Sequence, residues 1–77
     1  MANISRAQLK QLVEAAIFVA DQPLSQEQIQ LTVLNGLAVS RTMLKDTLAE
    51  LKLEYQARGI QLVEVATGFR FQSMDSL

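Results

Sequence analysis

Few side chains in this sequence could carry out a reaction. Serine and threonine hydroxyls are present, but a hydroxyl nucleophile needs a neighbouring base, and the chain contains no His. No lysine stands in a recognisable Ser-Lys signature. The absence of Cys also removes disulfides and thiolate metal sites. These omissions predict a protein that is not an enzyme and that uses neither a metal ion nor an organic cofactor.

Two other patterns resemble binding sites but have simpler explanations. Three carboxylates fall on one side of the third predicted helix: Asp46, Glu50 and Glu54. Spaced charges on a helix usually form its solvated face, so a cation site is not expected. Three glycines are far apart in the chain: Gly36, Gly59 and Gly68. Their spacing excludes a phosphate-binding loop and is typical of residues that end a helix or turn a strand.

A basic flank on the third predicted helix raises the question of DNA binding. It consists of Arg41, Lys45 and Lys52. At 100° per residue, the outward face of that helix instead carries Asp46, Ala49 and Leu53. Seven Lys and Arg against eight Asp and Glu give a net charge of −1, whereas free-standing DNA-binding domains usually have a basic excess. We expect direct DNA binding to be weak or absent, with a DNA-binding transcriptional regulator as the alternative function.

The first predicted helix covers residues 5–20. Its apolar positions recur at steps of three and four residues and mark one face: Leu9, Leu12, Val13, Ala16 and Ala20. Ser5 or Asn3 can cap this helix, and Pro23 follows its end. Beyond the proline, Leu24 is expected to add a short extended stretch beside a later hairpin.

Two further helices form a predicted helix-turn-helix. Ser25 and Gln28 have the spacing of a capping box, and Gly36 permits the left-handed backbone that ends the second helix. Ser40 can cap the third helix, which is expected to stop near residue 58 with Gly59 in its C-terminal turn. The third helix carries an apolar stripe: Leu44, Leu48, Leu51 and Tyr55.

Residues 58–73 read RGIQLVEVATGFRFQS and predict a strand, a glycine-containing turn and a second strand. Helix, helix, helix and hairpin is the order of a winged-helix domain, of class α+β. With 77 residues, 49% of them hydrophobic, the chain fits one small domain covering 1–77. Its longest apolar run, 15–20, is too short for a membrane span or a signal peptide, so neither is expected.

The register of the hairpin decides which side chains face the core, because a slip of one residue exchanges the two faces. A two-residue loop at 67–68 would put Glu64 beside Phe71. A three-residue loop at 66–68 pairs Glu64 with Arg70, and we prefer it because it gathers four apolar side chains on one face. These are Val63, Val65, Phe69 and Phe71.

Four apolar residues fall off the predicted core faces. Phe18 lies about 180° from Leu9 on the first helix, and Leu53 lies about 180° from Leu44 on the third. In the preferred register, the other two lie on the opposite face of the hairpin from its apolar side: Ile60 and Leu62. Either an element packs against each of these residues, or they form an exposed patch used for association. We predict the second, a partner-binding surface made of these four residues.

Two blocks of the sequence are distinctive: EAAIFVADQPLS at 14–25 and RGIQLVEVATGFRFQ at 58–72. Together they strongly resemble the start of the bacterial segregation and condensation protein B family. The most specific part is RGIQLVEV with the following glycine, aromatic residue and arginine, in which Phe69 stands where the family often has Tyr. The helix-turn-helix between the two blocks is less distinctive.

This resemblance implies a non-enzymatic protein built from tandem winged helices, of which the chain would be the first. Members of the family form homodimers and bind the kleisin, segregation and condensation protein A, of the SMC complex. Through the kleisin they join the SMC ATPase in chromosome condensation and segregation. The expected location is the cytoplasm, in association with the nucleoid. The resemblance transfers no catalytic residue and no kleisin contact to particular positions.

Overall fold

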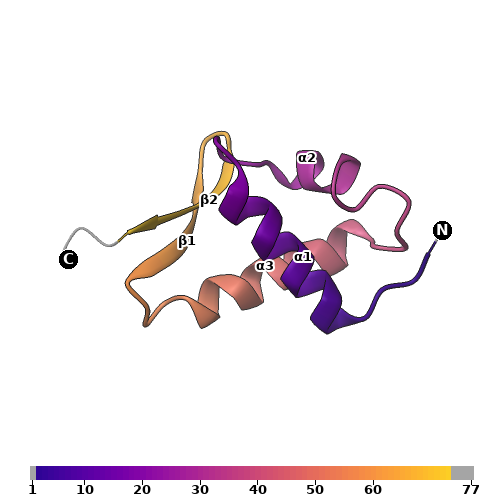
Figure 1. The fold of residues 1–77 in the computed structure, drawn as a ribbon, viewed down its shortest axis with the longest axis horizontal. Coiled ribbons are helices and arrows are strands. Elements are labelled where there is room, and N and C mark those ends of the chain that lie inside the picture. The colour runs from indigo at the N-terminus through magenta and orange to yellow at the C-terminus, as the bar shows by residue number, and fades with distance from the viewer. Residues whose placement is uncertain (1, 74–77) are drawn as a thin grey trace.

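The computed structural model describes residues 2–73. Over these residues the chain forms α1 (Arg6–Val19), α2 (Gln26–Leu31), α3 (Arg41–Glu54), β1 (Ile60–Val65) and β2 (Gly68–Ser73). The two strands make an antiparallel hairpin at one end of the helices (Figure 1). This order of elements confirms the predicted α+β winged helix.

Serine side chains begin all three of these helices, as predicted. The Ser5 hydroxyl accepts a hydrogen bond from the Gln8 amide, and Ser25 does the same for Gln28. In both pairs the glutamine side chain accepts a bond from the serine amide, which completes a capping box. Ser40 accepts from the amide of Met43 at the start of α3. Each cap satisfies backbone donors that have no partner inside the helix.

The core lies where α1 crosses α3 and where both meet the hairpin. The hydrophobic side chains that are almost fully buried come from the three helices, from β1 and from the segment between α2 and α3: Leu9, Val13, Ile17, Ile29, Leu34, Val39, Leu44, Leu48, Leu51 and Leu62. Leu9 and Val13 confirm the predicted inner face of α1, and Ile17 extends it. On the solvent side of this crossing, Arg6 and Lys10 of α1 pair with carboxylates of α3.

Two predicted glycine turns have different outcomes. Gly36 has φ of +83°, which confirms the predicted left-handed backbone, but α2 already ends at Leu31, so the prediction that Gly36 ends the second helix is wrong. The prediction for Gly59 is wrong, because α3 already ends at Glu54. The chain then continues through bonds between residues three apart, such as that from the Arg58 amide to the Tyr55 carbonyl, and these need no glycine.

The observed hairpin register is neither of the two weighed above. Leu62 pairs with Phe71, Glu64 with Phe69, and Val65 with Gly68, which leaves a two-residue loop at 66–67. The preferred three-residue loop is therefore wrong. So is the predicted apolar face, because paired residues share a face of the sheet. Phe69 and Phe71 pack against the core with Leu62, while Val63 and Val65 lie on the other face.

A contact with Leu24 accounts for this register. The amide of Phe69 donates to the Leu24 carbonyl (2.7 Å), and the amide of Leu24 donates to the Phe69 carbonyl (2.9 Å). This bridge confirms that Leu24 forms an extended stretch beside the hairpin. Gly68 is in β2 at φ +145°, where a Cβ atom would lie 2.3 Å from the Leu24 carbonyl carbon. The close approach requires glycine at the first position of the strand rather than in the loop.

Candidate interaction surfaces

Three of the four predicted association residues lie on the surface. Phe18 is 67% exposed, Leu53 65% and Ile60 42%. The prediction that Phe18 and Leu53 lie off the core is confirmed. Leu62 is a correction, because it is 1% exposed and belongs to the hydrophobic core. The reason is the register described above, which turns Leu62 to the same face as Phe71.

An aromatic cluster surrounds one of these residues. It consists of Phe18 of α1, Phe71 of β2 and Tyr55 at the end of α3. The Phe18 and Phe71 rings meet edge to face with centroids 6.2 Å apart, and the Tyr55 and Phe71 centroids are 4.8 Å apart. The guanidinium of Arg58 lies 4.6 Å from the centre of the Tyr55 ring. This cluster continues the core outward to an exposed phenylalanine.

Tyr55 also ties the cluster to α1 through its hydroxyl. That hydroxyl donates a hydrogen bond to the carboxylate of Glu14. The bond raises the pKa of Tyr55 above its ordinary value, and partial burial of the ring adds to the effect. Because the phenol stays protonated and donates, it holds the C-terminal end of α3 against α1.

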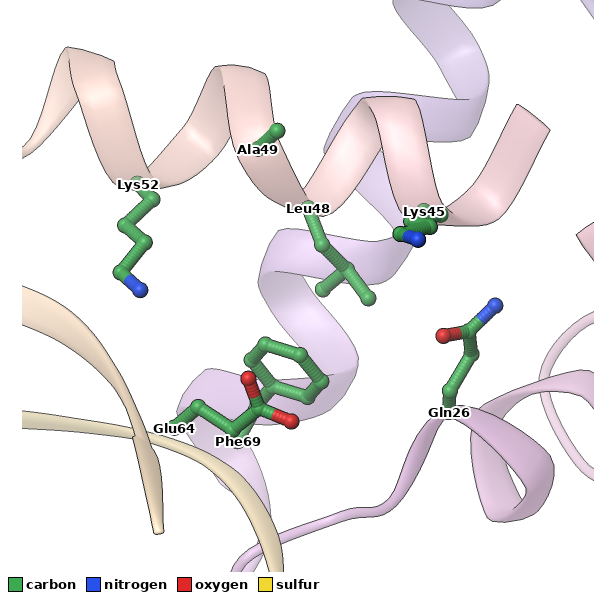
Figure 2. Close-up of a pocket in the computed structure, with 7 residues that line it drawn as sticks. All are labelled: Gln26, Lys45, Leu48, Ala49, Lys52, Glu64 and Phe69. Atoms are coloured by element: carbon green, nitrogen blue, oxygen red, sulfur yellow. The ribbon is translucent and has the colours of Figure 1, made fainter. Parts of the chain in front are cut away.

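A second surface feature is a groove between α3 and the hairpin. Seven residues line this α3–hairpin groove: Gln26, Lys45, Leu48, Ala49, Lys52, Glu64 and Phe69. Figure 2 shows Leu48 pointing from α3 toward the ring of Phe69, with Lys52 extending from α3 toward the hairpin and Glu64 projecting from the hairpin into the opening. Its volume is about 210 Å³. The groove thus has an apolar floor and a charged rim.

The ion pairs of α3 use its carboxylates and not the two lysines on the rim of this groove. Glu50 lies 2.6 Å from Arg6 and 3.2 Å from Lys10, and Lys10 also pairs with Glu54. The hydrogen bond with Lys10 lowers the pKa of Glu50. The pKa of Lys10 is raised, mainly by its hydrogen bond with Glu54 and next by its bond with Glu50. Among residues 2–73, Lys45 and Lys52 take part in no salt bridge.

The three basic residues of the predicted DNA-binding flank lie at two separate places on the surface. Lys45 and Lys52 lie on the rim of the α3–hairpin groove, where Glu64 is a third charge. Arg41 lines a separate hollow formed with α2, and its carbonyl accepts a hydrogen bond from Gln26. A surface that sets a carboxylate opposite its basic groups and apolar side chains between them is poorly matched to a phosphate backbone.

Within the part of the chain that the structure describes, the carboxylates do not gather into a metal site. No group of three or more His, Cys, Asp or Glu residues in 2–73 could hold a metal ion. Two of the carboxylates considered above, Glu50 and Glu54, are ion-paired across to α1. Over the same residues, none of the helices is long and apolar enough to cross a membrane.

Sequence reasoning missed both the aromatic cluster and the α3–hairpin groove. Helical periodicity places Tyr55 only in the apolar stripe of its helix, and Arg58 marks only the end of that helix. Both features join residues that are distant in the sequence. In the aromatic cluster, Glu14 and Tyr55 are more than forty positions apart, and in the groove, Lys45 and Glu64 are about twenty positions apart. A correct hairpin register would have placed Phe71 toward α1 and Phe69 toward α3, and it depends on the bridge to Leu24.

Comparisons with known proteins identify relatives over nearly the whole chain. Residues 11–77 match the family model described as segregation and condensation complex subunit ScpB. A segregation and condensation protein B homolog from Coxiella burnetii is 39% identical over 70 residues, which cover 91% of this chain and 34% of the relative. The chain thus spans about a third of the length of that curated relative.

Solved structures show the same fold. The crystal structure of ScpB from Mycobacterium tuberculosis superposes with a TM-score of 0.82 at 21% identity, covering 97% of this chain and 46% of that one. A dimer of the ScpB N-terminal domain complexed with ScpA peptide gives a TM-score of 0.75 at 32% identity, covering 95% of this chain and 83% of that one. The match of the family model to most of the chain is decisive. The chain belongs to the family of segregation and condensation complex subunit ScpB.

Proposed function

We propose that this chain is the winged-helix module of a non-enzymatic subunit that forms homodimers and binds the kleisin of the SMC complex. It would act in chromosome condensation and segregation. The observation that carries the proposal is the 32% identity, over 95% of the chain, to an ScpB N-terminal domain that was crystallised as a dimer with an ScpA peptide. Family membership supports the same role.

Surface apolar residues support an assembly role. Phe18, Leu53 and Ile60 are exposed beyond what the core requires, and we propose that they contribute to association. A domain of this size buries only about 60–65% of its unfolded surface, so contact with a partner adds to a small core. Leu62 contributes to that core and not to the contact.

We further propose that the chain is the first of two winged helices in a cytoplasmic protein that reaches the nucleoid through the SMC complex. Its coverage of solved relatives supports this division. It spans 46% of the Mycobacterium tuberculosis chain but 83% of the chain described as an N-terminal domain. The remaining length of the longer relatives leaves room for a second domain of similar size.

An affinity purification of the full-length protein from its native cells tests the proposed function. The extract is treated with nuclease at moderate salt, so that proteins held only through DNA are lost. Mass spectrometry is expected to identify a kleisin and an SMC ATPase among the recovered proteins. Recovery of RNA polymerase, or of no kleisin, would refute the assignment.

A DNA-binding transcriptional regulator is the second candidate. The observation in its favour is that Lys45 and Lys52 are exposed and make no salt bridge within residues 2–73. It requires an affinity for duplex DNA that falls with salt and disappears when Arg41, Lys45 and Lys52 are neutralised. Binding of the kleisin with no measurable affinity for DNA would eliminate this candidate.

A further inference from the structure

We propose that the α3–hairpin groove is the docking site for an acidic, amphipathic segment of the kleisin. This inference rests on the proposed function and goes beyond it by assigning a surface and a chemistry to the contact. The floor of the groove, the charges on its rim and the spacing between those charges all favour such a segment.

The floor of the groove is suited to one large apolar side chain. Leu48 of α3 points toward Phe69 of β2 (Figure 2), and Ala49 of α3 also lines the groove. The hollow measures about 210 Å³. An apolar cavity of about 150 Å³ already accommodates benzene, so a leucine or phenylalanine side chain of a partner fits here. Filling it would remove the exposed parts of Ala49 and Phe69 from water.

The rim selects a negatively charged partner. Lys45 and Lys52 contribute two positive charges, and Glu64 contributes one negative charge on the hairpin side. Glu50 and Glu54 are held by Arg6 and Lys10, and no salt bridge within residues 2–73 joins a carboxylate to either of these two lysines. The lysines are seven residues apart, which is two helical turns or about 10 Å along α3. A segment with carboxylates spaced by that distance on either side of an apolar residue complements the rim.

The same arrangement distinguishes a peptide from a nucleic acid. Duplex DNA would bring a row of phosphates to the rim and nothing apolar to the floor, and Glu64 would face those phosphates. A peptide can place an apolar side chain in the floor and an uncharged or basic group opposite Glu64. The groove is therefore assigned to the kleisin, and DNA is one of the outcomes that the experiment separates.

Binding measurements with the purified full-length protein and the kleisin from the same cells test this assignment. Lys52→Glu is expected to weaken kleisin binding about tenfold and to reduce its salt dependence, because the rim attracts carboxylates. Ala49→Trp is expected to weaken binding about tenfold or more by filling the floor of the groove. Glu64→Gln is expected to strengthen binding about threefold by removing a repelling charge.

Arg70→Glu is the matched control for the charge reversal. Arg70 pairs with Val63 and therefore lies on the hairpin face opposite Phe69, outside the groove. It is expected to change kleisin affinity by less than about twofold. Thermal unfolding and sedimentation of every variant establish that each is folded and has the oligomeric state of the unmodified protein.

The outcomes separate the groove assignment from the proposed function. If the unmodified protein does not bind the kleisin, the proposed function fails. If it binds, and the Lys52 and Ala49 variants bind equally well, the groove assignment is overturned while the function stands. Loss of DNA binding or of self-association in these variants, with kleisin binding unchanged, would give the groove to DNA or to a second copy and also overturn the assignment.

Discussion

Leu62 and Phe71 face each other across the hairpin, and both turn toward the helices. This pairing makes Leu62 the only residue of β1 that is almost fully buried. Truncation by Leu62→Ala is expected to lower the free energy of unfolding by about 2–4 kcal/mol, because it leaves a cavity beneath the hairpin. Urea denaturation measures this change.

Ile60→Ala is the control for that substitution. Ile60 lies on the same face two residues earlier but is 42% exposed, so its truncation is expected to cost less than about 1 kcal/mol. Equal destabilisation by the two substitutions would contradict the observed register.

Gly68 is expected to resist substitution. Gly68→Ala places a Cβ atom against the Leu24 backbone in a conformation unfavourable for other residues, and should destabilise the domain by about 2–4 kcal/mol. Gly36→Ala provides the comparison, because Gly36 also has a positive φ but open space around it, so a cost of about 1–2 kcal/mol is expected. Denaturant titration of both variants distinguishes the close contact from backbone strain alone.

Charged substitutions at Phe18 or Leu53 are expected to weaken self-association of the full-length protein without unfolding it. Both side chains are mostly exposed, so Phe18→Glu and Leu53→Glu should retain cooperative thermal unfolding. Analytical ultracentrifugation measures the dimer dissociation constant. A monomeric unmodified protein at micromolar concentration would remove the homodimer from the proposed function, and loss of cooperative unfolding in both variants would show that these residues are structural.

The ion pairs between α1 and α3 predict a pH dependence of stability. The pKa of Glu50 in the folded state is below its ordinary value of 4.5, so its contribution is present above that pH and is lost as the pH falls through the lowered pKa. For Lys10, with a pKa raised above 10.5, the contribution is complete below that pH and is lost as the pH rises through the raised value.

The variant Glu50→Gln tests the acidic limb. It is expected to flatten the loss of stability below pH 4.5 in thermal unfolding, and the difference should diminish in concentrated salt because these groups are accessible to solvent. An unchanged acidic limb would mean that Glu50 does not contribute to the pH dependence.

Local patterns predicted the helices well because their determinants are close in sequence. Ser5 and Gln8, like Ser25 and Gln28, satisfy each other's backbone within one turn, so spacing alone identified both helix starts. Exposure of Phe18 and Leu53 followed from helical periodicity in the same way.

The hairpin could not be predicted with the same rules because its register depends on a distant residue. Leu24 bonds to Phe69 across the fold, and this contact places Gly68 inside β2. The observed register places Leu62 in the core and not on the predicted contact surface. It also places Phe71 next to Tyr55 and Phe18. The groove between Lys52 and Glu64 depends on the same placement.

The bridge between Leu24 and Phe69 also affects the thermodynamics of recognition. It fastens the hairpin to the segment that joins α1 and α2, so the hairpin wall of the groove is held beside Gln26 before a ligand arrives. This domain would then lose little conformational entropy on binding, and most of the entropic cost would come from ordering the incoming peptide. Stiffening that peptide, rather than this domain, is the effective route to a tighter complex.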